Sequence, residues 1–244
     1  MSLQLRLRRR GYDLPTAFRA LRAVVQNPDD LPQVFVIIDA LSGRTLAKVA
    51  ARVRRTPGGP DVMVDGRRIA ALLRDRDALR SLPDGSLGRA YLDFVESEGI
   101  SVEGIEDASA RGRLGVERTA DEEFAYARLR DTHDLWHALT GYRGDVVGEL
   151  ALLAFSVAQT RNTAILAILL VAIAKGFARG NLGLLLDGFR RGSAATWLPA
   201  IAWEELLARP VDELRRELGV GEPRTYTAVR TNELRDAGVL ANAA

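Results

Sequence analysis

Apolar residues recur every three or four positions along most of the chain, which is the period of an amphipathic helix. In the first such segment, Leu14, Phe18, Leu21 and Val25 form one stripe, and the segment ends at Asn27-Pro28. Comparable patterns predict further helices over residues 41–53, 69–82, 86–98, 119–140, 145–160 and 210–219. The hydrophobic pattern therefore predicts an all-α protein.

Three segments depart from this pattern. Residues 34–41 fit a strand or a helix on periodicity alone, and Val62 to Val64 could form a short extended piece. Residues 99–118 are rich in glycine and charge, which favours a loose connection. Because no repeat and no convincing linker divides the chain, we expect a single-domain helical bundle over residues 1–244.

The longest uninterrupted apolar stretch runs from Ala164 to Ala174. A membrane-spanning helix needs about 20 apolar residues, so this stretch is too short to cross a bilayer. A helix that is apolar on all sides usually lies at the centre of a bundle, and this is the favoured interpretation. The alternatives are one wall of an apolar ligand cavity or a surface that touches lipid.

Composition excludes several classes of protein. With 47% hydrophobic and 27% charged positions among 244 residues, the chain has ordinary globular usage. Its 34 Lys and Arg against 32 Asp and Glu leave a net charge of +2, which gives no case for nucleic acid as a partner. Cysteine is absent, so any metal site must use imidazole and oxygen ligands. The N-terminus lacks the apolar core of a secretory signal, and we therefore expect a cytoplasmic protein.

The two histidines of the chain, His133 and His137, lie four residues apart in a helical pattern that ends at Thr140-Gly141. This spacing places both imidazoles on one face of a helix, where they can hold one cation, as in the HExxH zinc helices. Asp134 precedes His137 by three residues, so its carboxylate can reach the same ion from the flank. The alternative is that ordinary hydrogen bonds pair both histidines with carboxylates.

A fourth ligand is expected from the next helix. Asp145 follows a short turn and resembles an N-cap, which places Glu149 about one turn into that helix. A short turn favours an antiparallel helix hairpin, so Glu149 can face back toward the histidines. We therefore predict a metal site formed by His133, Asp134, His137 and Glu149.

The sequence HDLWH, followed by eleven residues and Glu149, resembles the HDxxH-x11-E motif of the coenzyme Q biosynthesis protein four family, which acts in ubiquinone biosynthesis. The likeness extends through residues 122–160 and, upstream, through SLPDGSLGRAYLDFVE at residues 81–96. Residues 213–219 are similar to the terminal helix of that family. The resemblance covers residues 70–220, whereas residues 1–65 match weakly, so we expect a divergent bacterial member.

This resemblance implies an all-helical fold, a divalent metal on His133, Asp134, His137 and Glu149, and an apolar cavity for a polyprenyl tail. The family's activity is described as oxidative removal of the C1 carboxyl of a polyprenylated hydroxybenzoate, which leaves a hydroxyl. The resemblance thus implies a metal-dependent decarboxylase, which is a lyase. The alternative is a non-catalytic scaffold that binds the prenyl lipid and organises a quinone biosynthesis complex.

Zinc, iron and manganese all suit a site of two imidazoles and carboxylates. No Gly-rich phosphate loop or dinucleotide fingerprint occurs, so no nucleotide or flavin cofactor is expected. Arg130 lies about one turn before His133, where it could pair a substrate anion or bridge to Asp131 or Asp134.

The resemblance also implies partners and a location. The expected partners are a polyprenylated aromatic lipid, other quinone biosynthesis enzymes and a membrane surface to which the protein binds peripherally. The expected location is cytoplasmic, on the inner face of the cytoplasmic membrane of a bacterium. The oligomeric state is left open, a homo-oligomer included.

Overall fold

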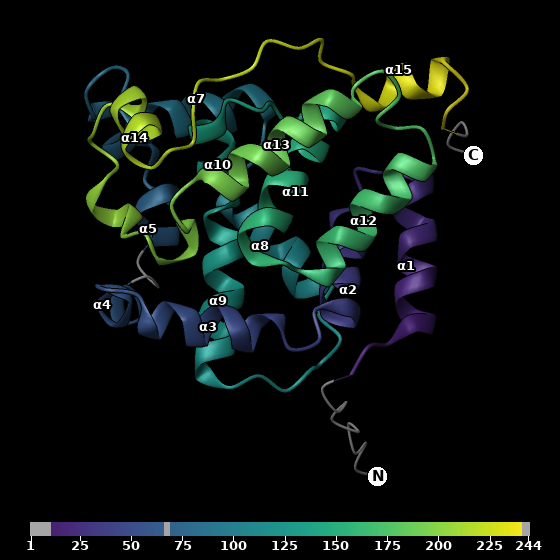
Figure 1. Ribbon diagram of the computed structural model, residues 1–244, viewed down its shortest axis with the longest axis horizontal. Coiled ribbons are helices and arrows are strands. Elements are labelled where there is room, and N and C mark those ends of the chain that lie inside the picture. The colour runs from purple at the N-terminus through teal and green to yellow at the C-terminus, as the bar shows by residue number, and fades with distance from the viewer. Residues whose placement is uncertain (1–10, 66–68, 241–244) are drawn as a thin grey trace.

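The computed structural model describes residues 11–65 and 69–240, and within these ranges the chain is helical and contains no strand (Figure 1). The first half contains α1 (Leu14–Gln26), α2 (Leu31–Leu41), α3 (Thr45–Arg55), α4 (Gly59–Asp65), α5 (Ile69–Arg74), α6 (Arg76–Ser81), α7 (Leu87–Glu98) and α8 (Val102–Arg111). The second half contains α9 (Ala120–Asp131), α10 (His133–Thr140), α11 (Val146–Thr160), α12 (Thr163–Ala174), α13 (Leu182–Ala194), η2 (Leu198–Ala200), η3 (Trp203–Glu205), α14 (Val211–Glu217) and α15 (Thr231–Asp236). The predicted all-α fold is confirmed, whereas the predicted domain over residues 1–244 includes residues outside the described ranges.

The central helix of the fold is α11. It packs against α10, α12 and α13, and it buries residues around its circumference, among them Leu150, Ala151, Leu152 and Phe155. A helix that is apolar on several faces needs neighbours on each of them, and α12 and α13 both supply such a neighbour (Figure 1). The largest hydrophobic cluster joins α7, α10, α11 and α14. The core therefore surrounds the helix that carries Glu149.

Two glycines let α13 cross α11 at close range. A Cβ on Gly188 would lie 2.4 Å from the carbonyl oxygen of Ala151, and one on Gly192 would lie 2.4 Å from that of Phe155. Because the two glycines are four residues apart, they share one face of α13. Any side chain at either position would push the two helices apart.

The predicted helices largely agree with the structure, and residues 34–41, which fitted either a strand or a helix, belong to α2. Residues 69–82 were expected as one helix but form two, α5 and α6. The reason is a new helix start at Asp75, whose side chain accepts a hydrogen bond from the backbone N–H of Ala78 at 3.0 Å. A local capping contact therefore overrides the continuous apolar pattern.

The expected extended piece is wrong, and the expected loose connection holds for only part of residues 99–118. Val62 to Val64 lie in α4, where Val62 is buried in the hydrophobic cluster that also contains residues of α3 and α9. The supposedly loose residues 99–118 contain α8, which begins at the N-cap Ser101. The buried face of α8 is formed by small residues, Ala108 and Ser109, which give little hydrophobic signal in the sequence.

The expected central position of the apolar stretch 164–174 is also wrong, because α12 lies at the surface. One side of this helix is buried, while Leu166 is 39% exposed and Leu170 is 56% exposed. Among the described residues, no helix has the length and hydrophobicity needed to cross a bilayer. The α12 helix therefore presents an apolar face to its surroundings.

The predicted apolar lipid cavity is not shown by the described residues. Two pockets are lined by residues around Asp39, and none of the four predicted metal ligands lines either one. Asp39 is buried, forms an ion pair with Arg118 and accepts a hydrogen bond from the backbone N–H of Leu114 at 2.9 Å. This region is therefore built around a satisfied charged pair.

Candidate metal centre

Both histidines are carried by α10, a helix of eight residues. At Thr132 the chain leaves α9, and the Thr132 hydroxyl donates a hydrogen bond to the carbonyl oxygen of Arg128 at 2.7 Å. The helix ends at Gly141, whose φ of +78° is left-handed and favours glycine. Within α10 the rings of His133 and His137 lie edge to face, with centroids 4.9 Å apart. The two imidazoles therefore share one face, as predicted.

The second element of the site begins at Asp145, the N-cap of α11. Its Oδ1 accepts hydrogen bonds from the backbone N–H groups of Val147 at 3.1 Å and Gly148 at 3.2 Å. Glu149 follows in the first turn. A Cβ on Gly148 would lie 2.2 Å from the carbonyl oxygen of Arg143, so glycine allows the turn to pack closely on the helix. The helix hairpin expected from the sequence is present.

The hairpin brings His133, His137 and Glu149 together, with one potential ligand atom from each residue within 4.8 Å of the others. The Nε2 atom of His137 lies 3.1 Å from Oε1 of Glu149, and the Nε2 atom of His133 lies 3.9 Å from Oε2. The His137 side chain is fully buried, whereas those of His133 and Glu149 are 33% and 41% exposed. One side of the cluster is thus closed by protein and the other is open.

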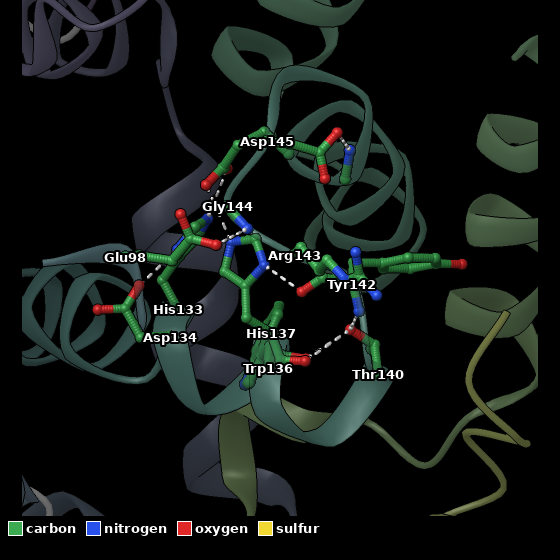
Figure 2. Close-up of polar contacts among 12 residues, drawn as sticks. Glu98, His133, Asp134, Trp136, His137, Thr140, Tyr142, Arg143, Gly144 and Asp145 are labelled. Atoms are coloured by element: carbon green, nitrogen blue, oxygen red, sulfur yellow. Dashed lines mark hydrogen bonds and ion pairs between the residues drawn. The ribbon is translucent and has the colours of Figure 1, made fainter. Parts of the chain in front are cut away.

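Two contacts fix the ring of His137. Its Nδ1 lies 2.9 Å from the backbone carbonyl oxygen of Tyr142 (Figure 2). Since a carbonyl only accepts, Nδ1 carries the hydrogen and Nε2 faces Glu149. Phe94 of α7 stacks on the same ring at a centroid distance of 4.6 Å. Nothing in the sequence marked Phe94 or the Tyr142 carbonyl for this role, because both contacts depend on tertiary packing.

The donor set fits a divalent metal. The buried Nε2 of His137 has no well-directed hydrogen-bond partner among the described residues, although the Glu149 carboxylate is close by. An uncompensated buried nitrogen is unfavourable, and a cation bound by this nitrogen and the carboxylate would satisfy both. Two imidazoles and one carboxylate form the ligand set of non-haem iron sites, and they also bind zinc.

The fourth predicted ligand, Asp134, lies beside this cluster. Its Oδ1 is 3.2 Å from Nδ1 of His133, so the carboxylate contacts the ring nitrogen that points away from Glu149. A carboxylate in this position orients a histidine ligand and increases its basicity. Asp134 is thus placed as a hydrogen-bond partner of His133, and its direct coordination of a metal stays a prediction.

Arg130 is engaged with acidic residues of the protein. Its Nε donates a hydrogen bond to Oδ1 of Asp131 at 2.6 Å, and its Nη2 lies 3.5 Å from Oε1 of Glu106. This is the bridge to Asp131 that sequence analysis gave as one of the alternatives. A contact of Arg130 with a substrate anion stays a prediction.

Burial and charge act in opposite directions on the pKa values of His137 and Glu149. Burial alone lowers the pKa of His137, but the charges of Glu149 and Asp134 outweigh this effect and raise the pKa above its ordinary value of 6.5. Burial alone raises the pKa of Glu149, but the charges of His137 and His133 outweigh it and lower the pKa to about 2. The carboxylate is therefore ionised near neutral pH and available to a cation.

Fold and site together define an all-helical protein with a candidate metal centre of two histidines and one carboxylate. Residues 14–224 match the protein family described as Coenzyme Q (ubiquinone) biosynthesis protein Coq4. The chain therefore belongs to the Coq4 family of ubiquinone biosynthesis proteins, which confirms the resemblance found in the sequence.

Curated relatives extend this match. The chain is 32% identical over 207 residues to the mitochondrial ubiquinone biosynthesis protein COQ4 homolog of Danio rerio, covering 82% of this chain and 73% of that protein. It is 35% identical over 179 residues to the mitochondrial ubiquinone biosynthesis protein coq4 of Aspergillus fumigatus, covering 71% of this chain but 60% of the fungal protein. A similar crystal structure, of a protein from Nostoc punctiforme, has a TM-score of 0.58 at 23% identity and covers 87% of this chain and 100% of that one. At this identity the structural match supports the fold alone.

The relatives correct the expected location. The expected location was cytoplasmic, on the inner face of a bacterial cytoplasmic membrane. The relatives from Danio rerio, Aspergillus fumigatus and Bos taurus are named mitochondrial proteins, and this finding overturns that expectation. The lack of a secretory signal does not distinguish the cytoplasm from an organelle, and the motif that carries the family resemblance does not distinguish a bacterial from a mitochondrial protein.

Proposed function

We propose that this Coq4 family protein is a metal-dependent enzyme of ubiquinone biosynthesis. Its substrate would be a polyprenylated hydroxybenzoate whose C1 carboxyl leaves as carbon dioxide. A hydroxyl from water would replace it, and dioxygen would accept the two electrons and leave as hydrogen peroxide. The observation that carries this proposal is the convergence of His133, His137 and Glu149 within 4.8 Å. A set of three protein ligands is typical of catalytic metal sites, whereas structural zinc sites usually have four.

Each residue of the cluster has a distinct task in this proposal. The Tyr142 carbonyl accepts a hydrogen bond from Nδ1 of His137, and Phe94 stacks on its ring. These two contacts fix the orientation of the ring and therefore of its Nε2 atom. The partly exposed His133 and Glu149 border the open side, where substrate would bind. A divalent zinc, iron or manganese ion on these side chains would supply a Lewis acid for the substrate carboxylate, and iron would also allow reaction with oxygen.

The proposal is tested with the substitution Glu149→Gln, which keeps the shape of the side chain and removes its charge. We expect loss of metal binding and of turnover of a polyprenylated hydroxybenzoate, with unchanged helical content and unchanged prenyl-lipid binding. The matched control is Glu217→Gln in α14, which removes an exposed ion pair with Arg209 and leaves the site intact.

The same assay separates the enzyme from the scaffold. If Glu149→Gln retains full turnover, the reaction does not depend on a metal held by Glu149, and the proposed metal-dependent mechanism is wrong. If the wild-type protein binds the prenyl lipid but turns over none of it with any of the three metals, the non-catalytic scaffold becomes the better description.

We also propose that the protein binds peripherally to a membrane through α12 and α13, where its lipid substrate and the other quinone biosynthesis proteins would meet it. Both helices pack on α11, and their exposed apolar residues are Leu166, Leu170, Leu182, Leu186 and Phe189. Exposed cations flank these residues at Arg161, Lys175, Arg179 and Arg190. The acidic residue of α13, Asp187, is paired with Arg224. An apolar face edged by positive charge complements a surface of anionic phospholipid.

A further inference from the structure

The C-terminal segment of residues 222–230, here called the strap, passes over the turn that connects the two helices of the metal centre. The strap has no regular secondary structure and joins α14 to α15, where Figure 1 shows it as a yellow trace along the edge of the molecule. The turn spans residues 141–145, between the last residue of α10 and the first of α11. The strap and the turn are about 80 residues apart in sequence, so their contacts are wholly tertiary.

Tyr226 makes the central contact between strap and turn. Its hydroxyl donates a hydrogen bond to Oδ2 of Asp145 at 2.7 Å and accepts one from the backbone N–H of Arg143 at 2.9 Å. A Cβ on Gly148 would lie 2.4 Å from this hydroxyl oxygen, so the glycine makes room for the tyrosine. One hydroxyl therefore joins the turn to the N-cap of α11.

A second contact ties the strap to the start of α11. The backbone N–H of Val229 donates to Oδ1 of Asp145 at 3.0 Å, and the backbone N–H of Val146 donates to the carbonyl oxygen of Val229 at 2.9 Å. Asp145 thus accepts hydrogen bonds from the strap with both carboxylate oxygens while it caps α11. The position of the helix that carries Glu149 is set jointly by its cap and by the strap.

The strap also reaches the helix that supports His137. Arg230 forms an ion pair with Glu98 at 2.6 Å. Oε1 of Glu98 accepts a hydrogen bond from the backbone N–H of Gly144 at 3.2 Å (Figure 2). Glu98 is the last residue of α7, the helix from which Phe94 stacks on His137. At the other end of the strap, a Cβ on Gly141 would lie 2.5 Å from Cβ of Pro223. The strap therefore contacts both ends of the turn.

We infer that Tyr226 is a positioning residue of the metal centre, and that the strap fixes the separation between the imidazoles of α10 and the carboxylate of α11. The inference rests on the proposed metal site. In the second half of the turn, the backbone N–H groups of Arg143 and Gly144 donate to side chains from elsewhere in the fold, Tyr226 and Glu98. Without the strap this half of the turn would have alternative conformations. A shift of α11 along the hairpin would move Glu149 away from His137, although all three ligand side chains would still be present.

The test measures binding of Co(II) alone by competition with a chelator, together with the visible absorption spectrum of the bound ion, which reports ligand geometry. Loss of a residue that hydrogen-bonds a metal ligand directly raises Kd by about 10- to 100-fold. Because Tyr226 acts on Glu149 through Asp145, we expect for Tyr226→Phe a rise in Kd of up to about tenfold, together with an altered spectrum. The matched control is Tyr126→Phe, because the Tyr126 hydroxyl is also hydrogen-bonded, to Ser109 at 2.8 Å, in a different hydrophobic cluster. The Tyr126→Phe variant should lose about as much thermal stability as Tyr226→Phe does, but it should keep the wild-type Kd and spectrum for Co(II).

Three other results of the Co(II) experiment would contradict either the inference or the proposed metal site. If Tyr226→Phe binds Co(II) with the wild-type Kd and spectrum, Tyr226 is only structural and the inference fails. If Tyr126→Phe weakens binding equally, the effect is one of global stability and the inference also fails. If the wild-type protein binds neither Co(II) nor zinc, the proposed metal site itself is wrong.

Discussion

The ring of Phe94 lies almost parallel to the imidazole of His137, with centroids 4.6 Å apart and an angle of 13° between the planes. The two residues come from α7 and α10, whose contact is among the most extensive between helices of this fold. Stacking covers one face of the imidazole, while the Tyr142 carbonyl accepts a hydrogen bond from its Nδ1 atom. The direction of the His137 Nε2 atom is thereby set before any ion binds.

We predict that Phe94→Leu weakens metal binding without unfolding the protein. Aromatic pairs contribute about 0.5–1.5 kcal/mol beyond their buried area, so loss of this contact should raise the metal Kd by about two- to twelvefold. Titration with zinc in the presence of a competing chelator measures the change. An unchanged Kd would show that the Tyr142 carbonyl alone orients the ring.

The contact between His137 and Glu149 should make the free energy of unfolding of the metal-free protein depend on pH. Because the pKa of His137 is raised above 6.5, its contribution to the free energy of unfolding is complete below that pH and is lost as the pH rises through the raised value. The pKa of Glu149 is lowered from 4.5 to about 2, so its contribution is present above 4.5 and is lost as the pH falls toward 2.

Both contributions coexist between pH 4.5 and 6.5. We therefore expect the difference in unfolding free energy between wild type and Glu149→Gln, measured with a chelator present, to be largest in this window and smaller at about pH 9. Urea unfolding at several pH values measures it. If this difference in unfolding free energy is larger at about pH 9 than between pH 4.5 and 6.5, the assigned pairing of His137 with Glu149 is wrong.

The close crossing of α11 and α13 predicts opposite results for two glycines of the same helix. Gly188→Ala places a methyl group 2.4 Å from the Ala151 carbonyl oxygen and should destabilise the fold by about 1–3 kcal/mol. Gly183→Ala, also in α13, meets nothing within 4 Å and should be neutral or stabilise by up to about 1 kcal/mol. Chemical denaturation of both variants checks the prediction, and equal effects would refute the close approach.

Binding to membranes should depend on the exposed leucines of α12 and α13. The double substitution Leu170→Glu and Leu186→Glu should lower binding to phosphatidylcholine vesicles containing an anionic phospholipid by at least about tenfold, because it removes apolar area and adds negative charge. Co-sedimentation measures the bound fraction. Val64→Glu on α4 is the control, since Val64 is 79% exposed and belongs to another region of the fold.

The outcome for the double variant also distinguishes lipid from protein as the occupant of this face. If the wild-type protein is a dimer in solution, and the double variant is a monomer that binds vesicles as well as wild type does, the face is an interface between copies of the chain. The membrane proposal would then be abandoned.

The sequence was sufficient to predict the all-α fold and the hairpin that brings His133, His137 and Glu149 together. Both follow from local rules, the helical period and the N-cap at Asp145, which act over a few residues. The position of Asp134 could not be predicted, because coordination and contact with His133 differ only in the side-chain rotamer.

Features that depend on tertiary packing could not be predicted from the hydrophobic pattern of the sequence. The α12 helix is apolar on all sides, so periodicity could not show that Leu170 faces outward. The α8 helix was missed because Ala108 and Ser109 pack its buried face with little hydrophobic signal. The contact of Tyr226 with Asp145 joins residues 81 positions apart, and a single sequence contains no local signal for such a pair.

The strap has a consequence for the order of events during protein synthesis. The three residues of the candidate metal centre lie between positions 133 and 149, but the segment that secures their geometry ends at Arg230. A nascent chain emerges from the ribosome N-terminus first, so the ligands are exposed well before Tyr226 and Arg230. Stable binding of an ion at the proposed site is therefore expected only after the strap has been synthesised and has packed on the turn.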